Sequence, residues 1–420
     1  MSSSSLWVPL RPSDPVRIYY VLSVAATFCF TLCFTVYLVY MVVTAGLGPL
    51  QLILVGTVLE VTCFLFEVPT GVVADRFSRR LSVLIGFVLI GLGFLLGGSV
   101  PTFVGLLASQ VLWGIGSTFT SGATVAWITD EIGEDQVRQV FTMEQQMSLA
   151  AAFAGTVCAG ALSLIDLRLP ILLAGAGFVG LAIGLALCMP ERNFSPALPT
   201  DSGSLAGMLS TTRVGLRLAR TTRVVRSLLV ISLLAGLASE VFDRLWQLQV
   251  IDEYPLPSIR GADNPAVWFA GVALVGIVVS LAASLLVNRF GAAHLASAHP
   301  GVLLAVLAAL EVLGIVAVAL APTLGVALAG VWLKGAAGVV AAPVLAAWLN
   351  RNVDSGVRAT VLSLNAQAGA IGQVLGGPPL GLLAGRTSVR LALLVSAGLL
   401  APTIGLFVRL RPRGQQPAGL

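Results

Sequence analysis

The 420-residue sequence has few charged residues. Asp, Glu, Lys and Arg make up 10% of it, against roughly 25% in ordinary soluble domains. Hydrophobic residues make up 57%, and the mean hydropathy is +0.96. Such a chain cannot cover a water-soluble globule with polar side chains. The composition therefore excludes a soluble protein and predicts one that crosses a membrane many times.

Residues that carry most enzyme and metal chemistry are also scarce. Lys334 is the only lysine, and its Leu-Lys-Gly context excludes the G-x-x-x-x-G-K-[ST] nucleotide loop of an ATP-driven pump. His294 and His299 have no acidic neighbours, and the five cysteines lie in apolar runs. We expect no enzyme activity, metal, cofactor or disulfide. The net charge of +5 comes from arginines scattered over short loops, which indicates membrane topology rather than nucleic-acid binding.

Long uncharged runs such as 81–100 predict membrane helices and exclude the alternating segments of a β-barrel. The expected helices of the first set are 17–44, 50–73, 81–99, 102–129, 139–164 and 169–190. Those of the second set are 223–250, 266–288, 301–320, 323–350, 358–384 and 388–409. We therefore predict an all-α polytopic membrane protein with twelve transmembrane helices in two six-helix bundles.

The polar stretch 191–222 is rich in Ser, Pro, Thr and Arg, and we interpret it as a cytoplasmic linker. It divides the chain into an N-terminal bundle, 1–190, and a C-terminal bundle, 223–420. With the N-terminus inside, 18 of the 24 basic residues fall on cytoplasmic segments and 4 on outer ones. This bias predicts a multi-pass protein of the inner (plasma) membrane with both termini cytoplasmic. The polar N-terminal segment does not have the pattern of a signal peptide.

An internal repeat is visible when positions are compared at a fixed offset of 221 in residue number, which we call the repeat offset. Pro101-Thr102 corresponds to Pro322-Thr323, and Trp127 corresponds to Trp348. Gln146, Gly155 and Gly160 correspond to Gln367, Gly376 and Gly381. Because the order is parallel, the repeat predicts two pseudo-symmetric halves related by an axis along the membrane normal.

The segment from Gly71 to Arg80, which we call the signature segment, reads GVVADRFSRR after the second predicted helix. It resembles the G-x-x-x-D-R-x-G-R-R signature of the major facilitator superfamily, with Ser78 in place of the usual glycine. A degenerate copy, Asn288 to Gly291, follows the eighth predicted helix. The resemblance implies the major facilitator fold and secondary active transport by alternating access.

By the same resemblance, the signature segment forms a conformational latch. Asp75 would brace the cytoplasmic end of helix 358–384, and Arg79 would pair with Asp130 at the end of helix 102–129. The proposed latch residues are Gly71, Asp75, Arg76, Arg79, Arg80 and Asp130. The alternative is that the three arginines only anchor topology.

The run from Glu67 to Asp75 resembles the drug:proton antiporters with twelve helices, a branch that includes macrolide and tetracycline exporters. Helix 139–164 keeps Gly155 and Gly160 of the antiporter signature but lacks its proline. The resemblance implies proton-coupled efflux of amphipathic compounds such as antibiotics. The alternative is export or import of one specific metabolite or siderophore. We expect a small-molecule substrate, protons and lipid as partners, no nucleic acid, and a monomer.

Ionisable residues inside the predicted helices are costly, and each must face protein or water. The proton-coupling candidates are Glu60, Glu67, Glu240, Asp243, Arg244, Glu311 and Lys334. Glu60 lies about ten residues, or ~15 Å, into its helix, which places it near the midplane. A structural hydrogen-bonding role is its alternative. Lys334 could pair with Glu311, Glu240 could pair with Arg244, and Asp243 could serve an outer gate.

A mostly apolar cavity with a few amide groups would suit a bulky amphipathic substrate better than a sugar. The predicted lining residues are Phe28, Tyr37, Gln110, Trp113, Gln146, Asn365, Gln367 and Gln373, with Phe30 beside Phe28. For the aromatic members, helix packing is the competing interpretation.

Overall fold

A computed structural model describes residues 14–196, 222–256, 265–289, 300–352 and 355–409. The chain divides into two compact units. The first unit contains Met1–Tyr37 and Leu65–Gly203, and the second contains Leu38–Phe64 and Ser204–Leu420. Residues 38–64 therefore group with the second half of the chain, although they lie in the first half of the sequence. Most of the predicted linker, both histidines and the end of the degenerate signature copy lie outside the described residues.

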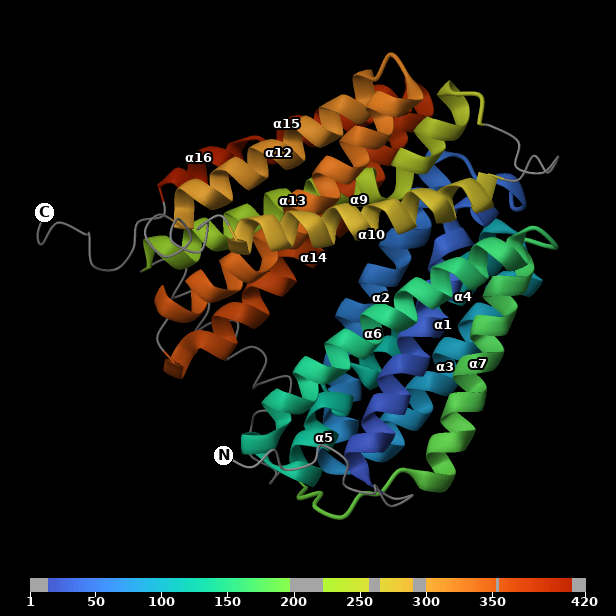
Figure 1. Ribbon diagram of the computed structural model, residues 1–420, viewed down its shortest axis with the longest axis vertical. Helices are drawn as coiled ribbons and strands as arrows, with labels where there is room; N and C mark the ends of the chain where they lie inside the picture. The colour runs from blue at the N-terminus through green and yellow to red at the C-terminus, as the bar shows by residue number, and fades with distance from the viewer. Residues whose placement is uncertain (1–13, 197–221, 257–264, 290–299, 353–354, 410–420) are drawn as a thin grey trace, which may run out of the picture. The chain divides into compact units, whose positions relative to one another are not determined.

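In the first half of the sequence, the described residues form seven helices (Figure 1). They are α1 (Pro15–Val43), α2 (Pro49–Arg76), α3 (Arg79–Ser99), α4 (Phe103–Thr120), α5 (Ala123–Ile132), α6 (Glu134–Ser163) and α7 (Arg168–Cys188). Within the first unit, α3 packs against α4 and α7. The ring centre of Phe30 on α1 lies 4.7 Å from that of Phe178 on α7, which forms an aromatic core between these helices.

The predicted helix 102–129 is broken into α4 and α5. Gly122 has φ of +72°, a left-handed conformation that glycine adopts more easily than other residues, and α5 begins directly after it. Gly133, with φ of +83°, separates α5 from α6 in the same way. These two turns determine the direction in which Asp130, near the end of α5, is presented.

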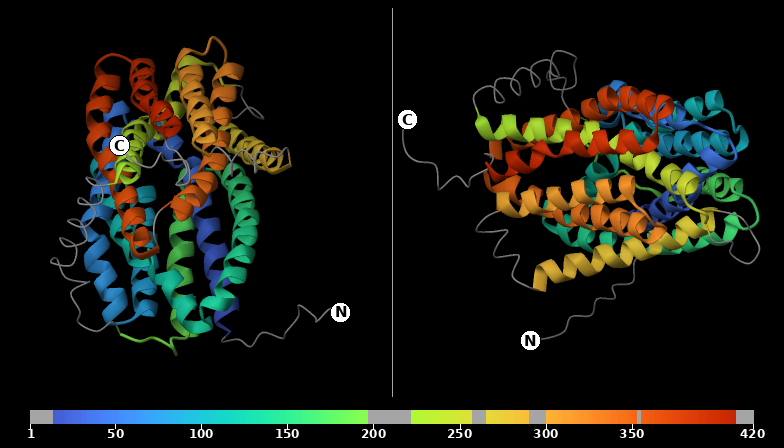
Figure 2. Two further views of the ribbon diagram at one scale, coloured as in Figure 1. Left: turned by 90° about the vertical axis from the view of Figure 1, so that its left-hand side faces the viewer. Right: turned by 90° about the horizontal axis from the view of Figure 1, so that it is seen from above.

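The described residues of the second half also form seven helices (Figure 1). They are α9 (Arg223–Glu253), α10 (Pro265–Arg289), α12 (Pro300–Leu320), α13 (Leu324–Asn352), α14 (Ser355–Arg386), α15 (Val389–Leu400) and α16 (Pro402–Val408). Within the second unit, α9 packs on α14 and α15, and α12 packs on α13, α15 and α16. The further views in Figure 2 show most of these elements as long helices.

Eleven helices of the described chain are long and apolar enough to cross a membrane, counting α4 with α5 and α15 with α16 as one span each. The twelfth long helix, α14, has 32 residues and is less apolar, since it contains Arg358, Asn365, two glutamines and two prolines. The part of the chain that the structure describes contains no strand. The predicted all-α membrane architecture is confirmed.

The helices repeat at the offset that the sequence indicates. Four helices of the second half begin one repeat offset after a helix of the first half: α12 after α3, α13 after α4, α14 after α6, and α15 after α7. The packing repeats with them. A Cβ at Gly93 would lie 3.0 Å from the backbone nitrogen of Trp113, and one at Gly314 would lie 2.9 Å from that of Lys334. Lys334 is therefore the repeat counterpart of Trp113.

The first helix of each half follows a different offset. Thr27 of α1 donates to Ser148 of α6, while Gly236 of α9 lies against Gly369 of α14. Gly369 of α14 lies one repeat offset after Ser148 of α6, so these two residues correspond. Their contacts on the first helix of each half, Gly236 and Thr27, are only 209 residues apart. Residues of α9 therefore correspond to residues of α1 that are 209 positions earlier. This register makes Asp243 the counterpart of Phe34.

Candidate functional site

Ionisable side chains of α2 and α9 form a first charged group within the second unit, which we call the arginine triad: Glu60, Glu240 and Arg244. The Nε atom of Arg244 donates to Glu240 Oε1 at 3.1 Å, one helical turn away on α9. The Glu240 side chain is only 4% exposed. Glu60 of α2 interacts electrostatically with both of these residues. One arginine is thus shared by two carboxylates on different helices.

Gly56 makes the approach of α2 to this triad possible. A Cβ added at Gly56 would overlap Glu240 Oε1 and would lie 2.6 and 2.7 Å from Arg244 Nε and Nη2. On the neighbouring helix α14, a Cβ at Gly377 would meet Thr57 Oγ1 at 3.1 Å and Glu240 Cγ at 3.3 Å. The sequence does not single out Gly56, because one glycine among 45 carries no distinguishing signal.

A second charged group, the lysine triad, contains Asp243 of α9, Glu311 of α12 and Lys334 of α13. Lys334 Nζ donates to Asp243 Oδ1 at 3.0 Å and lies 4.5 Å from the centre of the Phe242 ring. Glu311 interacts electrostatically with both charged partners. The direct ion pair therefore joins Lys334 to Asp243 and not to Glu311, the partner that the sequence suggests.

The two triads differ in access to their surroundings. The Asp243 side chain of the lysine triad is 53% exposed, whereas the Glu240 side chain of the arginine triad is 4% exposed. A charged group that faced lipid at this depth would be strongly disfavoured, so the open side of Asp243 must face water or substrate. Asp243 is therefore the accessible carboxylate of the site, whereas the Lys334 and Arg244 side chains are similarly shielded, at 21% and 18% exposed.

The charge count of the site is unbalanced. Both triads contain two carboxylates and one cation, and α9 joins them because Glu240 also interacts electrostatically with Asp243. With every group ionised, each triad would carry one negative charge more than its cation balances. An excess charge in a low-dielectric region favours uptake of a compensating cation, of which the proton is the simplest. The arrangement therefore leaves one carboxylate in each triad without a cation of its own.

The first repeat shows that the fold does not require these charges. The counterparts of Asp243 and Lys334 are Phe34 and Trp113, whose ring centres are 4.9 Å apart. An apolar contact in one half and an ion pair in the other occupy corresponding places between corresponding helices. The contact between these helices can therefore be made with or without charge.

The signature segment forms a separate site within the first unit. Arg79 Nη1 lies 2.5 Å from Asp130 Oδ2, joining the start of α3 to the end of α5. Asp75 and Arg76 are exposed at the end of α2. A Cβ at Gly71 would meet nothing within 4 Å. The structure brings together Arg79 and Asp130 of the predicted latch.

Ser78, which departs from the family signature, has a structural role in this segment. Its hydroxyl accepts from Leu81 N at 2.9 Å, capping α3, and donates to Glu191 Oε2 at 2.6 Å. The other Glu191 oxygen accepts from Arg80 N at 2.9 Å. Arg80 Nη2 donates to the Ala186 carbonyl of α7 at 2.5 Å. The sequence does not reveal the role of Glu191, because its partners lie far away along the chain.

Of the predicted lining residues in the first unit, Tyr37 and Gln110 are buried and hydrogen-bonded to each other at 2.8 Å. The Gln110 carbonyl oxygen has no hydrogen-bond partner among the described residues. Trp113 packs on Phe34, Phe28 is half-buried beside Gly155, and Gln146 is exposed on α6. Tyr37 and Gln110 are therefore the two predicted lining residues described in this unit that bond directly to each other.

In the second unit, two of the predicted amides lie at the contact of α9 with α14. Asn365 Oδ1 accepts from Ser232 at 2.6 Å, and Gln373 Nε2 donates to Ser239 at 3.4 Å. Gln367 donates to Ser363 on its own helix. In the first unit, Glu67 is exposed and accepts from Ser121 at 3.2 Å.

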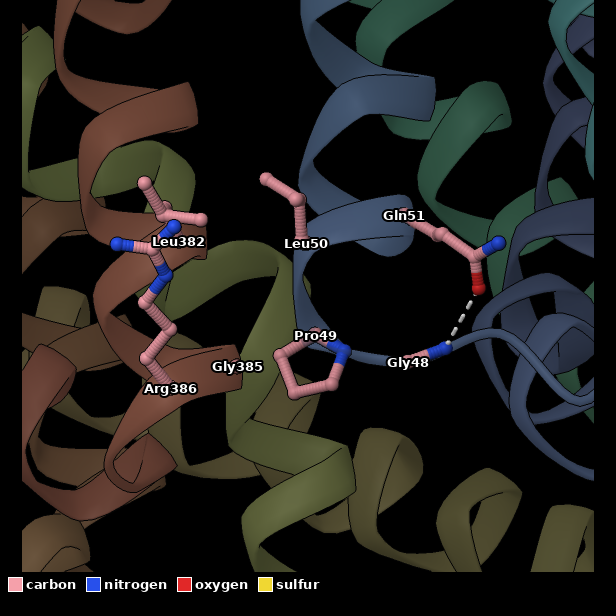
Figure 3. A pocket seen from close by; sticks show the side chains of 7 residues that line it. All are labelled: Gly48, Pro49, Leu50, Gln51, Leu382, Gly385 and Arg386. Carbon is pink, nitrogen blue, oxygen red and sulfur yellow. Dashed lines mark hydrogen bonds between the residues drawn. The ribbon is translucent and has the colours of Figure 1, made fainter.

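A cavity of about 320 Å³ lies where α2 begins and α14 ends. Its lining residues are Gly48, Pro49, Leu50, Gln51, Leu382, Gly385 and Arg386. Figure 3 shows Leu50 and Leu382 pointing toward each other from the two helices, and the Gly48 amide donating to Gln51. This cavity contains none of the predicted substrate residues.

Comparisons with known proteins agree with this architecture. Residues 20–310 match the model of the Major Facilitator Superfamily. The uncharacterized MFS-type transporter YxaM of Bacillus subtilis (strain 168) is 21% identical over 360 residues, which cover 84% of this chain and 86% of that protein.

Two solved structures illustrate the shared fold. The nucleoside transporter NupG has a TM-score of 0.75 at 14% identity, covering 95% of this chain and 100% of that one. A bacterial homolog of the human lysosomal transporter Spinster, in an inward-facing and occupied conformation, has a TM-score of 0.65 at 16% identity. That match covers 93% of this chain and 95% of the other.

Proposed function

This chain belongs to the major facilitator superfamily, and from that premise we propose that it is a proton-coupled exporter of amphipathic small molecules. Membership makes it a multi-pass secondary transporter and not an enzyme. The proposal adds the coupling ion, the direction and the substrate class. We also propose that the protein is a monomer of the inner membrane and that both of its termini are cytoplasmic.

The observation that carries the proposal is the presence of two carboxylates for each cation in both triads. Protons can enter such groups without leaving a bare buried cation, because one carboxylate remains for Arg244 or Lys334. Moving one charge across 100 mV releases ~2.3 kcal/mol, enough for a concentration ratio of roughly fifty.

The substrate class is supported by the character of the predicted lining. Four of the nine predicted lining residues are aromatic, and four of the five amides are hydrogen-bonded to neighbours, as in the pairs Gln110–Tyr37 and Asn365–Ser232. Few polar groups are free for a ligand that needs many hydrogen bonds, which favours amphipathic compounds such as antibiotics. Transport of one specific metabolite or siderophore is the alternative.

Transport in membrane vesicles tests the coupling. An imposed pH gradient should drive accumulation of a lipophilic antibiotic substrate, found first by a susceptibility panel with and without expression. Glu60→Gln should abolish the pH-driven part and leave the protein folded. Accumulation that is indifferent to a protonophore would exclude proton coupling. Full activity of Glu60→Gln would move the role to Glu240, Asp243 or Glu311.

A further inference from the structure

The N-terminal half of α2 rests on helices of the second unit, although it belongs to the first half of the sequence. Its contact surface, which we call the α2 seat, is formed by Gly377 and Gly381 of α14 and by the arginine-triad residues of α9. A Cβ at Gly377 would lie 3.0 Å from Ile53, and one at Gly381 would lie 3.1 Å from the same side chain. Ile53 is fully buried there.

Glycines on both sides allow this close contact. Gly56 leaves room for the Glu240–Arg244 pair, and Gly377 leaves room for Ile53 and Thr57. Small residues let helix backbones approach closely and pack well in a membrane. The close approach also brings Glu60, one turn after Gly56 on α2, within electrostatic reach of Arg244.

Among the described residues, the charge that α2 presents to this contact is that of Glu60. The titratable groups that face Glu60 are Arg244 and Glu240, and Glu240 in turn faces Asp243. Ionised Glu60 attracts Arg244 across the two helices. When Glu60 is neutral, that attraction is lost, while Arg244 keeps its 3.1 Å hydrogen bond to Glu240. Release of α2 therefore leaves no bare buried charge behind.

We propose that Glu60 is a proton-controlled bolt: ionised, it holds the N-terminal half of α2 on its seat, and protonated, it lets α2 withdraw. Gly56 is the positioning residue that brings α2 close enough for Glu60 to act. The inference rests on the proposed proton coupling and specifies what the proton does. In the predicted topology this end of α2 is on the outer side, so proton entry from outside would open the outer gate.

Cysteine labelling tests the bolt directly. The five native cysteines are replaced by alanine, and Ile53→Cys places one thiol in the α2 seat. Membrane vesicles are treated with a membrane-impermeant maleimide over the range from about pH 5 to 8. Ile90→Cys, on the fully buried face of α3 in the first unit, is the matched control.

The labelling rate at each pH is divided by that of a free thiol at the same pH. The resulting rate for Ile53→Cys should increase as the pH falls, and that for Ile90→Cys should not change. Adding Glu60→Gln should raise labelling at neutral pH about tenfold, the ratio given by ~1.4 kcal/mol, and remove its pH dependence. Gly56→Ala should raise labelling at every pH because its methyl group collides with the Glu240–Arg244 pair.

Three results would overturn the bolt: labelling that ignores pH, labelling that keeps its pH dependence in Glu60→Gln, or low labelling of Gly56→Ala. If Glu60→Gln does not reach the membrane, the pH dependence of Ile53→Cys labelling still tests the bolt, and Gly56→Ala tests the close contact of α2 with its seat. Transport on the same vesicles separates the two proposals. Unchanging labelling with proton-driven transport overturns the bolt alone, whereas transport indifferent to the gradient overturns the proposed function.

Discussion

The ion pair between Lys334 and Asp243 carries the strongest residue-level evidence for function. Trp113 and Phe34 occupy the corresponding places in the first repeat, so this helix contact can be made without charge. An ion pair that is partly exposed contributes little to stability. The proposed proton coupling gives this pair a role in the transport cycle, which a variant of Asp243 tests.

Asp243→Asn should therefore preserve folding and impair coupling. The variant removes the excess negative charge of the lysine triad and leaves Lys334 with Glu311 as its electrostatic partner. Proton-driven transport should fall at least tenfold, equivalent to about 1.4 kcal/mol, while expression and thermal stability stay near wild type. Transport in vesicles and thermal unfolding in detergent measure the two effects.

Glu253→Gln is the matched control for Asp243→Asn. Glu253 also pairs with a cation from another helix, Arg390, at 3.3 Å, but the side chains of Arg390 and Glu253 are 48% and 43% exposed. Surface pairs of this kind contribute roughly 0–1 kcal/mol. Its transport should equal that of the wild type. Equal losses in both variants would show that the effect of Asp243→Asn is not specific to the lysine triad.

All six triad residues could be identified from the sequence, because a charge is conspicuous in an apolar run. The sequence does not reveal which of them form pairs, except for Glu240 and Arg244, which lie one turn apart on one helix. Lys334 is paired with Asp243, whereas Glu311 Oε1 lies next to Gly338, one turn further along α13, at 3.6 Å from a Cβ built there. Contacts between helices depend on packing that periodicity does not encode.

At the scale of helices, the two halves share a register that glycines help to maintain. Gly93 on α3 and Gly314 on α12 face α4 and α13 at positions one repeat offset apart. The sequence indicates this offset through Trp127 and Trp348, since tryptophan is rare. The offset of 209 between α1 and α9 is not evident from the sequence, because the residues in register there, such as Thr27 and Gly236, differ in kind.

Gly314→Ala should destabilise the second half. The new methyl group would lie 2.7 Å from the Gly330 carbonyl oxygen and 2.9 Å from Lys334 Cβ, so α12 and α13 must separate slightly. Overpacking of this kind costs about 1–3 kcal/mol. Thermal unfolding followed by fluorescence-detected size-exclusion chromatography should show a lower midpoint.

Gly335→Ala provides the comparison on α13. A Cβ at Gly335 would meet nothing within 4 Å, so the variant gains helix propensity without a collision. Alanine is favoured over glycine in a helix interior by about 0.5–1 kcal/mol. Its unfolding midpoint should be unchanged or higher. A Gly314→Ala midpoint equal to that of Gly335→Ala would contradict the close contact of α12 with α13.

At the scale of the whole molecule, alternating access requires contacts that exist in one state and break in another. Arg79 and Asp130 join α3 to α5 within the first unit, and Glu191 ties α3 to the segment after α7. The Arg79 and Asp130 side chains are 19% and 28% exposed, so water can reach them when the pair opens. Under the proposed latch, this pair stabilises the outward-facing state.

Arg79→Lys should slow transport without weakening substrate binding. The rigid fork of arginine suits a carboxylate, and lysine keeps the charge but loses that geometry. A loss of ~1.4 kcal/mol in one state already changes the conformational ratio tenfold. Initial transport rates and equilibrium binding of the same substrate measure the two quantities, and Arg390→Lys at the exposed pair is the control.

The charge-swapped double variant, Arg79→Asp with Asp130→Arg, distinguishes a latch from a topology anchor. Direct pairing predicts that each single variant is slow and that the double variant recovers part of the rate, because the attraction is restored with reversed sign. A topology anchor predicts instead that Arg79→Asp alone changes the membrane orientation, and that the swap, which returns one basic residue to the cytoplasmic side, restores it. Recovery of rate with unchanged membrane orientation, measured by labelling of a terminal cysteine, supports the latch, and slow transport by all three variants contradicts it.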